Sequence, residues 1–184
     1  VRQNRKGLER ELEMIREEEK AGRRLYQTPR ESLSILRNGK SAAGRRRAFE
    51  QLVRRARSRP NLRRYLRIAR ADDDPSVRIS ALRVGASVTE DLAPWIADGL
   101  ADRNAEVRAA AAALATPLPS EVGGPMLLSV LESETDGYAF RELFEVLNKI
   151  TGQSRFLPTG AEDDAEQRAA AVAQWSDWRT KWAK

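Results

Sequence analysis

The strongest constraint on the fold is a segment that the chain repeats. Residues 74–82, with the sequence DPSVRISAL, correspond to residues 104–112, with the sequence NAEVRAAAA. A third copy begins at Phe140, and a degenerate earlier one begins at Arg46. Asp74 and Asn104 are residues that cap helix N-termini, and Pro75 suits a first helical position because its missing N–H costs nothing there. Each copy therefore predicts a helix start, and the spacing predicts an array of similar units.

Apolar residues recur at helical spacing in five stretches between residues 49 and 147. No alternating run rich in Val, Ile and Thr, which would favour a strand, is present. Each stripe covers one face only, so each helix has to bury it against a neighbour. The sequence predicts an all-α fold. The stripes are Phe49, Leu52, Val53 and Ala56; Leu62, Tyr65, Leu66 and Ala69; Val77, Ala81 and Val84; Val107, Ala111 and Leu114; Phe140, Leu143, Phe144 and Leu147.

This pattern resembles HEAT repeats, which are stacked helical hairpins with a proline in the first helix and an Asp…Val-Arg…Ala turn into the second. The best match runs from Leu92 to Ala111 and includes Pro94, Asp102 and Arg108. The resemblance covers residues 31–150 and implies a short right-handed α-solenoid of about four HEAT-like hairpins. The closing segments, residues 147–153 and 175–178, look like the tail of many bacterial HEAT-type proteins, where a helix with paired tryptophans ends the stack.

Three regions are predicted: a charged helical arm at 1–28, the repeat solenoid at 29–151, and a loop plus a capping helix at 152–184. The arm has a narrow apolar seam of Leu8, Leu12 and Ile15, and so narrow a seam needs something to pack against. We expect it to order against a partner or across the repeats. Loops are predicted at 116–125, between repeats, and at 152–164, where the chain is expected to be mobile.

Three tryptophans, Trp175, Trp178 and Trp182, are spaced three and four residues apart. On one face of a single helix they would cover the open end of the fourth hairpin. The alternative is an exposed aromatic contact for a partner, because the indole ring suits interfaces as well as cores.

Composition excludes several chemistries. The chain has neither His nor Cys, so Ser-His-Asp and Cys-His nucleophiles, disulfides and thiolate or imidazole metal sites cannot form. No apolar run approaches the roughly 18 residues of a membrane span. No cofactor is expected, and the protein is not expected to be an enzyme.

Charge is unevenly distributed along the chain. Residues 1–70 hold 22 Lys and Arg against 8 Asp and Glu, whereas the remainder of the chain is acidic. Helical geometry places many arginines of residues 45–70 away from the apolar stripes. Such a surface can bind an acidic protein or an anionic membrane surface, bind nucleic acid, or simply remain solvated. The candidate binding residues are Arg46, Arg47, Arg54, Arg57, Arg63, Arg64, Arg67 and Arg70.

A second set of arginines has a structural interpretation. The resemblance implies that Arg78 and Arg108, with Asp72 and Asp102 six residues before them, tie neighbouring turns together through charge-assisted hydrogen bonds. Thr135 stands at the matching position before Arg141, so this ladder is expected to weaken in the fourth repeat.

Three other motifs are interpreted structurally. Gly39-Lys40-Ser41 ends like a phosphate-binding loop but lacks the required upstream glycine and strand, so a hairpin turn is predicted. The acidic clusters 72–74 and 162–164 precede predicted helices and are expected to cap them rather than bind Mg²⁺ or Ca²⁺. Trp95 and Asp98 echo residues of HEAT-like DNA glycosylases, but Trp95 occupies a position where the repeat needs a core residue.

The sequence therefore predicts a non-catalytic scaffold or accessory subunit that docks into a larger assembly through the arm and the arginine surface. The alternative is a nucleic-acid-binding module that uses residues 45–70. The bacterial resemblance and the start at Val1 slightly favour export or the cell envelope over the cytoplasm.

Overall fold

The computed structural model describes residues 28–56 and 58–182. Within these residues the chain forms ten α-helices and no strand, which confirms the all-α prediction. The chain divides into two compact units, Val1–Ala81 and Leu82–Lys184, and the division falls inside α5 (Pro75–Val88). The arm residues Leu8, Leu12 and Ile15, together with Arg57, lie outside the described residues.

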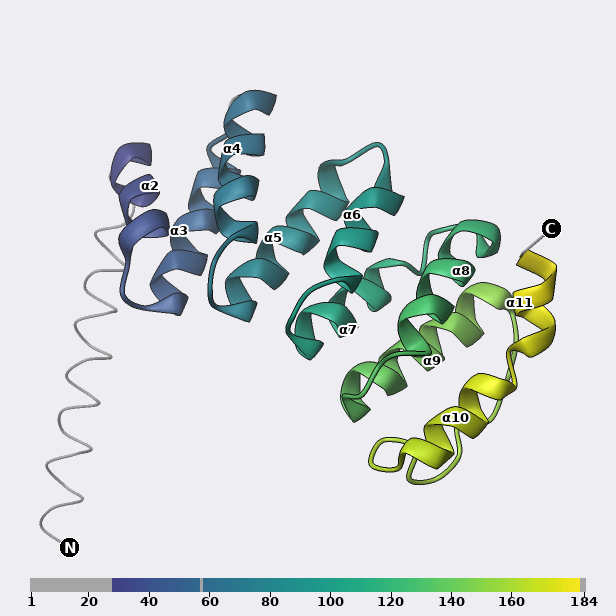
Figure 1. The fold of residues 1–184 in the computed structure, drawn as a ribbon. Helices are drawn as coiled ribbons and strands as arrows, with labels where there is room; N and C mark the ends of the chain where they lie inside the picture. The colour runs from purple at the N-terminus through teal and green to yellow at the C-terminus, as the bar shows by residue number, and fades with distance from the viewer. Residues whose placement is uncertain (1–27, 57, 183–184) are drawn as a thin grey trace, which may run out of the picture. The chain divides into compact units, whose positions relative to one another are not determined.

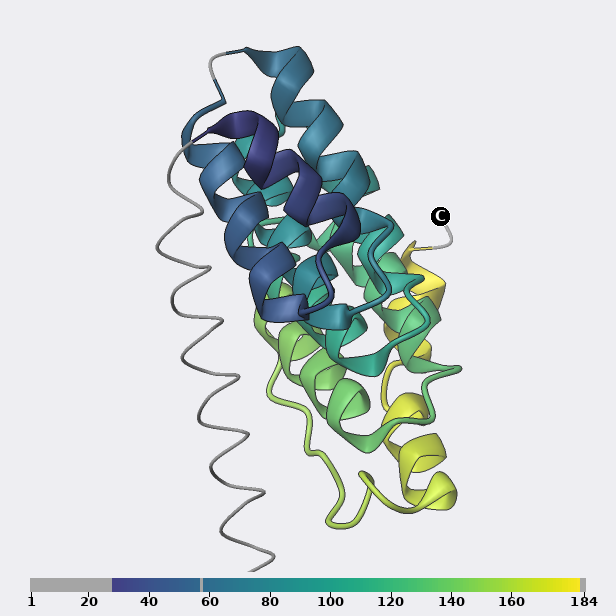
Figure 2. The same ribbon diagram turned by 90° about the vertical axis from the view of Figure 1, so that its left-hand side faces the viewer.

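The first unit contains α2 (Pro29–Asn38), α3 (Ala42–Arg54) and α4 (Arg59–Arg70). Thr28 caps α2 by accepting the N–H of Glu31, and Ser41 caps α3 by accepting the N–H of Gly44. The three residues between these helices therefore form the predicted turn, and α2 packs against α3 and α4 (Figures 1 and 2). The core of the unit is formed by Leu36, Phe49, Leu52, Leu66 and Ala69.

The second unit contains α6 (Leu92–Leu100), α7 (Ala105–Leu114), α8 (Ser120–Leu131) and α9 (Gly137–Thr151). Neighbours in sequence pack together, α6 on α7 and α8 on α9, and α7 also packs on α9. These contacts are consistent with an array of helical hairpins. The core contains Ile96, Val107, Leu127 and the complete stripe of α9, namely Phe140, Leu143, Phe144 and Leu147.

Two predicted boundaries differ from the structure. The expected loop at 116–125 is shorter, because α8 begins at Ser120 and includes Pro125. The expected single capping helix is two helices, α10 (Ala165–Ala173) and α11 (Ser176–Trp182), and α11 packs beside α8 (Figure 1). Trp175 lies between them, so the three tryptophans do not share one helix. No described helix is long and apolar enough to cross a membrane.

Candidate interaction surface

The arginines of residues 45–70 divide into bonded and unbonded groups. Arg46 and Arg54 lie 3.9 and 4.0 Å from the carboxylate of Glu50. These ion pairs are long and exposed, and such pairs contribute little to stability. Arg70 is half-buried and also interacts within the chain. Within this block, four arginines are exposed and have no ion-pair partner among the described residues: Arg47 on α3, and Arg63, Arg64 and Arg67 on α4. Helix α4 thus carries most of the unbonded positive charge of residues 45–70.

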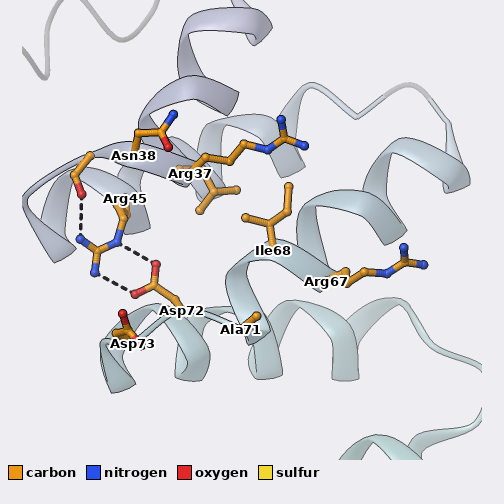
Figure 3. Close-up of a pocket in the computed structure, with 10 residues that line it drawn as sticks. Arg37, Asn38, Arg45, Arg67, Ile68, Ala71, Asp72 and Asp73 are labelled. Atoms are coloured by element: carbon orange, nitrogen blue, oxygen red, sulfur yellow. Dashed lines mark hydrogen bonds and ion pairs between the residues drawn. The ribbon is translucent and has the colours of Figure 1, made fainter.

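A groove of about 610 Å³ lies at one end of the first unit, between the end of α2 and the end of α4. Arg37 of α2 and Arg67 of α4 line it, and Figure 3 shows Ile68 between their side chains. Arg37 is exposed and, like Arg67, has no ion-pair partner among residues 28–56 and 58–182. The groove therefore combines two unbonded cations with an accessible apolar side chain. The prediction from sequence missed Arg37, because it lies outside the dense arginine block.

The aromatic residues of the arginine block are not part of this surface. Phe49 is fully buried and Tyr65 is 9% exposed. Neither ring can stack on an unpaired base, and base stacking is what single-stranded nucleic acids require of a protein surface.

Arg45 shows how the remaining arginines are used. It stands four residues after the helix cap Ser41 and donates its Nη1 to the carbonyl oxygen of Gly39 at 2.8 Å. Its Nε and Nη2 donate to the two carboxylate oxygens of Asp72, at 2.7 and 2.8 Å (Figure 3). The carboxylate raises the pKa of the Arg45 guanidinium. We call this arrangement an arginine bridge: one nitrogen holds the preceding turn, and the other two hold a carboxylate from a later turn.

Arg108 forms a second arginine bridge in the second unit. It follows the cap Asn104 by four residues and donates its Nη1 to the carbonyl of Asp102 at 2.9 Å. Its Nε and Nη2 bind the carboxylate of Glu134 at 2.6 and 2.7 Å. That carboxylate also accepts the N–H groups of Thr135 and Asp136, at the start of α9. The bridge thus links the starts of α7 and α9.

The predicted pairing of these residues needs correction. Arg78 and Arg108 do contact Asp72 and Asp102, but they donate to the backbone carbonyls, and the Asp72 carboxylate binds Arg45 instead. The expected weakening in the fourth repeat was wrong, because the carboxylate comes from Glu134 rather than from position 135. Arg108 follows its cap Asn104 by four residues, whereas Arg141 follows its cap Asp136 by five. Counting back six residues from Arg141 therefore gave Thr135 instead of Glu134.

Glu134 is the most buried acid in the described part of the chain, with its side chain 1% exposed. Burial by itself raises the pKa of a carboxyl, but the hydrogen bonds from Arg108 and from the N–H groups of Asp136 and Thr135 outweigh it. The pKa of Glu134 is therefore lowered from its usual value. The charged form belongs to the folded state.

A further arginine of this kind was missed from the sequence. Arg168 follows the cap Asp164 by four residues and donates its Nη1 to the carbonyl of Glu162 at 2.9 Å. The Glu162 carboxylate accepts Nη1 of Arg141 at 2.7 Å. The detectable signal was the segment AEQRAAA at 165–171, which copies AEVRAAA at 105–111.

The tryptophans occupy different environments. Trp175 is fully buried, with its ring edge-on to Phe144 at 6.0 Å between centroids. The guanidinium of Arg155 lies 4.7 Å from the Trp175 ring centroid. Trp178 and Trp182 are half-buried, and a Cβ on Gly124 of α8 would lie 2.1 Å from the Trp182 ring. Trp182 therefore packs closely on α8.

The segment from 152 to 164 is anchored rather than loose. The side-chain amide of Asn148 both donates to the carbonyl of Arg155 and accepts its N–H, each at 3.0 Å. The guanidinium of Arg155 binds Asp177, and Gln174 donates to the carbonyl of Phe156 at 2.8 Å. The expectation of a mobile loop is not supported by these contacts. Phe156 is nevertheless 70% exposed.

The acidic clusters and Trp95, which could suggest a metal site or an active site, form hydrogen bonds within the fold. Asp74 accepts the N–H and the hydroxyl of Ser76, and the hydroxyl hydrogen bond lowers the pKa of Asp74. Asp164 caps α10 through the N–H of Glu166. Trp95 donates its Nε1–H to the carbonyl of Leu82 at 2.8 Å. Over the described residues, no group of three or more acids is placed to hold a metal ion.

Comparison with known proteins adds no relationship: no family model, no curated protein and no solved structure matches this chain.

Proposed function

We propose that this protein is a non-catalytic interaction scaffold that binds an acidic partner protein through the first unit. The observation that carries the proposal is the groove in which Arg37 and Arg67 flank Ile68. Two unbonded guanidinium groups around an apolar side chain fit a segment that alternates carboxylates with apolar residues. Charge complementarity would supply orientation and rate, and burial of Ile68 would supply affinity that salt does not remove.

The α4 arginines extend this surface beyond the groove. Arg63 lies one helical turn before Arg67, so the two side chains project from the same side of α4. Ile68 offers an apolar contact that an apolar residue of a protein segment can cover, whereas a phosphate backbone has no group to pack on it. These features support a protein ligand over the alternative, a nucleic acid.

A direct binding experiment separates the two ligand classes. The full chain is titrated at about 50 and about 300 mM salt with a labelled peptide of alternating Glu and Leu and with a short DNA duplex. We expect the peptide to retain most of its affinity at the higher salt, because part of its binding is apolar. A duplex held by several phosphate contacts would lose affinity by orders of magnitude over this range.

Matched variants locate the binding surface. Arg37→Gln with Arg67→Gln removes two charges at the groove, and we expect about tenfold weaker peptide binding, as for the loss of charge-assisted hydrogen bonds. Arg47→Gln with Arg54→Gln removes the same charge from the exposed side of α3, outside the groove. Equal losses for both pairs, or tight duplex binding that both pairs reduce, would replace the scaffold by the nucleic-acid alternative.

A further inference from the structure

The arginine bridge is complete at Arg45 and Arg108 but only half formed at Arg168. The Nη1 of Arg168 holds the carbonyl of Glu162 in the same way, yet no described residue hydrogen-bonds to its Nε or Nη2. We infer that the groove beside α10 is a second docking site, and that it binds a helix of a partner protein whose preceding turn carries an Asp or Glu for Arg168. This site shares no residue with the groove of the first unit.

A comparison of α7 with α10 supports this inference. Their first seven residues differ only at Val107 and Gln167. In α7, which packs on α9, Ala109 and Ala112 are 2% and 0% exposed. The corresponding residues of α10, Ala169 and Val172, are exposed and half-buried. Corresponding positions of two similar helices are therefore covered in α7 and accessible in α10.

A groove of about 440 Å³ lies along this accessible face. Arg168, Ala169 and Val172 line one side, and Leu131 and the buried ring of Phe140 line the other. A helix with small apolar residues on one face would bury Ala169 and Val172, in the way that Ala109 and Ala112 are buried in α7.

Charge within the groove selects a carboxylate. Two acids on its wall are already paired, Glu134 with Arg108 and Glu132 with Arg179. Arg168 retains two donors in the fork geometry that binds both oxygens of a carboxylate. In α7 the same donors bind Glu134, two residues before the cap of α9, and this defines the chemistry of the occupant.

A second copy of this chain is a poor occupant. In the turn before α3, the position two residues before the cap is Gly39, which has no carboxylate. The acids of the turns before α9 and α10 are held within the chain, by Arg108 and Arg141. Head-to-tail stacking of copies would therefore leave Arg168 without a partner, so we assign the site to a different protein.

The test uses the intact chain and a synthetic peptide that copies residues 131–151. This peptide carries the acidic turn and the helix that α7 binds. In the intact chain α9 already covers that face of α7, so the peptide can bind only elsewhere. We expect saturable binding, with a shift of the Arg168 Nε–H signal in the NMR spectrum of the chain. Glu→Gln at the peptide position that copies Glu134 should weaken binding about tenfold, as loss of a charge-assisted pair does.

Variants of the chain complete the test. Arg168→Lys keeps the charge but loses the two-nitrogen fork, and we expect a loss similar to that of the peptide change and not additive with it. Ala169→Trp fills the groove while residue 168 remains an arginine, and it should abolish binding, whereas Ala170→Trp, one exposed position away, should leave the affinity unchanged. No saturation by about 1 mM peptide, or binding that ignores both Arg168→Lys and Ala169→Trp, would overturn the inference.

Discussion

The guanidinium of Arg108 holds the carboxylate of Glu134 through two hydrogen bonds of 2.6 and 2.7 Å, although the residues lie 26 positions apart. The acid also accepts two backbone N–H groups from the turn into α9. Four hydrogen bonds thus converge on one carboxylate whose side chain is 1% exposed. Such a group stabilises the fold only while all its partners are present, because removal of one leaves a buried charge unpaired.

Glu134→Gln should therefore lower the free energy of unfolding by about 3 kcal/mol, in the range seen when one partner of a buried pair is removed. Urea denaturation followed by circular dichroism measures the change. Glu132→Gln is the control, because Glu132 pairs with Arg179 at the surface and its loss should cost less than about 1 kcal/mol. Similar costs for the two variants would show that the Arg108 bridge contributes little.

The pH dependence of stability should follow Glu134. Its pKa is lowered in the folded chain, so the unfolded chain binds more protons as the solution is acidified. The stabilisation is present above the unfolded value of about 4.3 and is lost as the pH falls through the folded value. Urea midpoints between about pH 6 and pH 3 should fall more steeply for the native chain than for Glu134→Gln. Parallel curves would assign the acid sensitivity to other groups.

Most helices could be predicted from local signals in the sequence. Ser41, Asn104 and Asp164 each cap the helix that follows, and the stripe beginning at Phe140 is buried over its whole length. These features depend on neighbours within a few residues, so periodicity and capping chemistry are sufficient to predict them. The end of the loop at Ser120 was misjudged, because Pro125 and two glycines suggested a break where tertiary packing retains a helix.

The partners of the arginines could not be read in the same way. Asp72 lies six residues before Arg78, but its carboxylate binds Arg45, which is 27 residues away. Sequence proximity suggested the nearer arginine, whereas the turns that meet in space come from successive hairpins. Alignment on the helix caps, rather than on the arginines, would have identified Glu134.

The residues that form the candidate binding surface were harder to predict than the partners of single arginines. The dense arginine block indicated a basic surface, but Arg37 lies outside it and lines the same groove as Arg67 only because α2 and α4 end near that groove. Conversely, Arg45 belongs to the block but is bonded on both edges. The sequence therefore predicted where positive charge is concentrated, but only the fold shows which arginines are free to bind a partner.

Two glycines should respond in opposite directions to substitution by alanine. A Cβ on Gly85 would lie 1.8 Å from the ring of Trp95, whose Nε1–H is fixed to Leu82, so Gly85→Ala should destabilise the chain by about 2 kcal/mol. A Cβ on Gly44 would meet only Ser41 at 3.8 Å, an ordinary contact. Gly44→Ala should stabilise α3 by about 0.5–1 kcal/mol, because glycine lowers helix stability. Thermal unfolding of both variants checks the signs, and a loss of stability in Gly44→Ala would contradict this account.

Trp175 should behave as a core residue and Trp178 as a surface one. Trp175→Ala removes a fully buried ring that contacts Phe144 and Arg155, and we expect a loss of about 3–5 kcal/mol. Trp178→Ala should cost much less, since that ring is partly accessible and lies beside Lys181.

Trp175→Phe separates volume from hydrogen bonding at the same position. The Nε1–H of Trp175 has no hydrogen-bond partner among the described residues, so phenylalanine sacrifices packing but no polar contact. We expect Trp175→Phe to recover more than half of the stability lost in Trp175→Ala, measured by urea denaturation with circular dichroism. If phenylalanine were as damaging as alanine, the indole N–H rather than the buried ring would be the feature that the C-terminal segment requires.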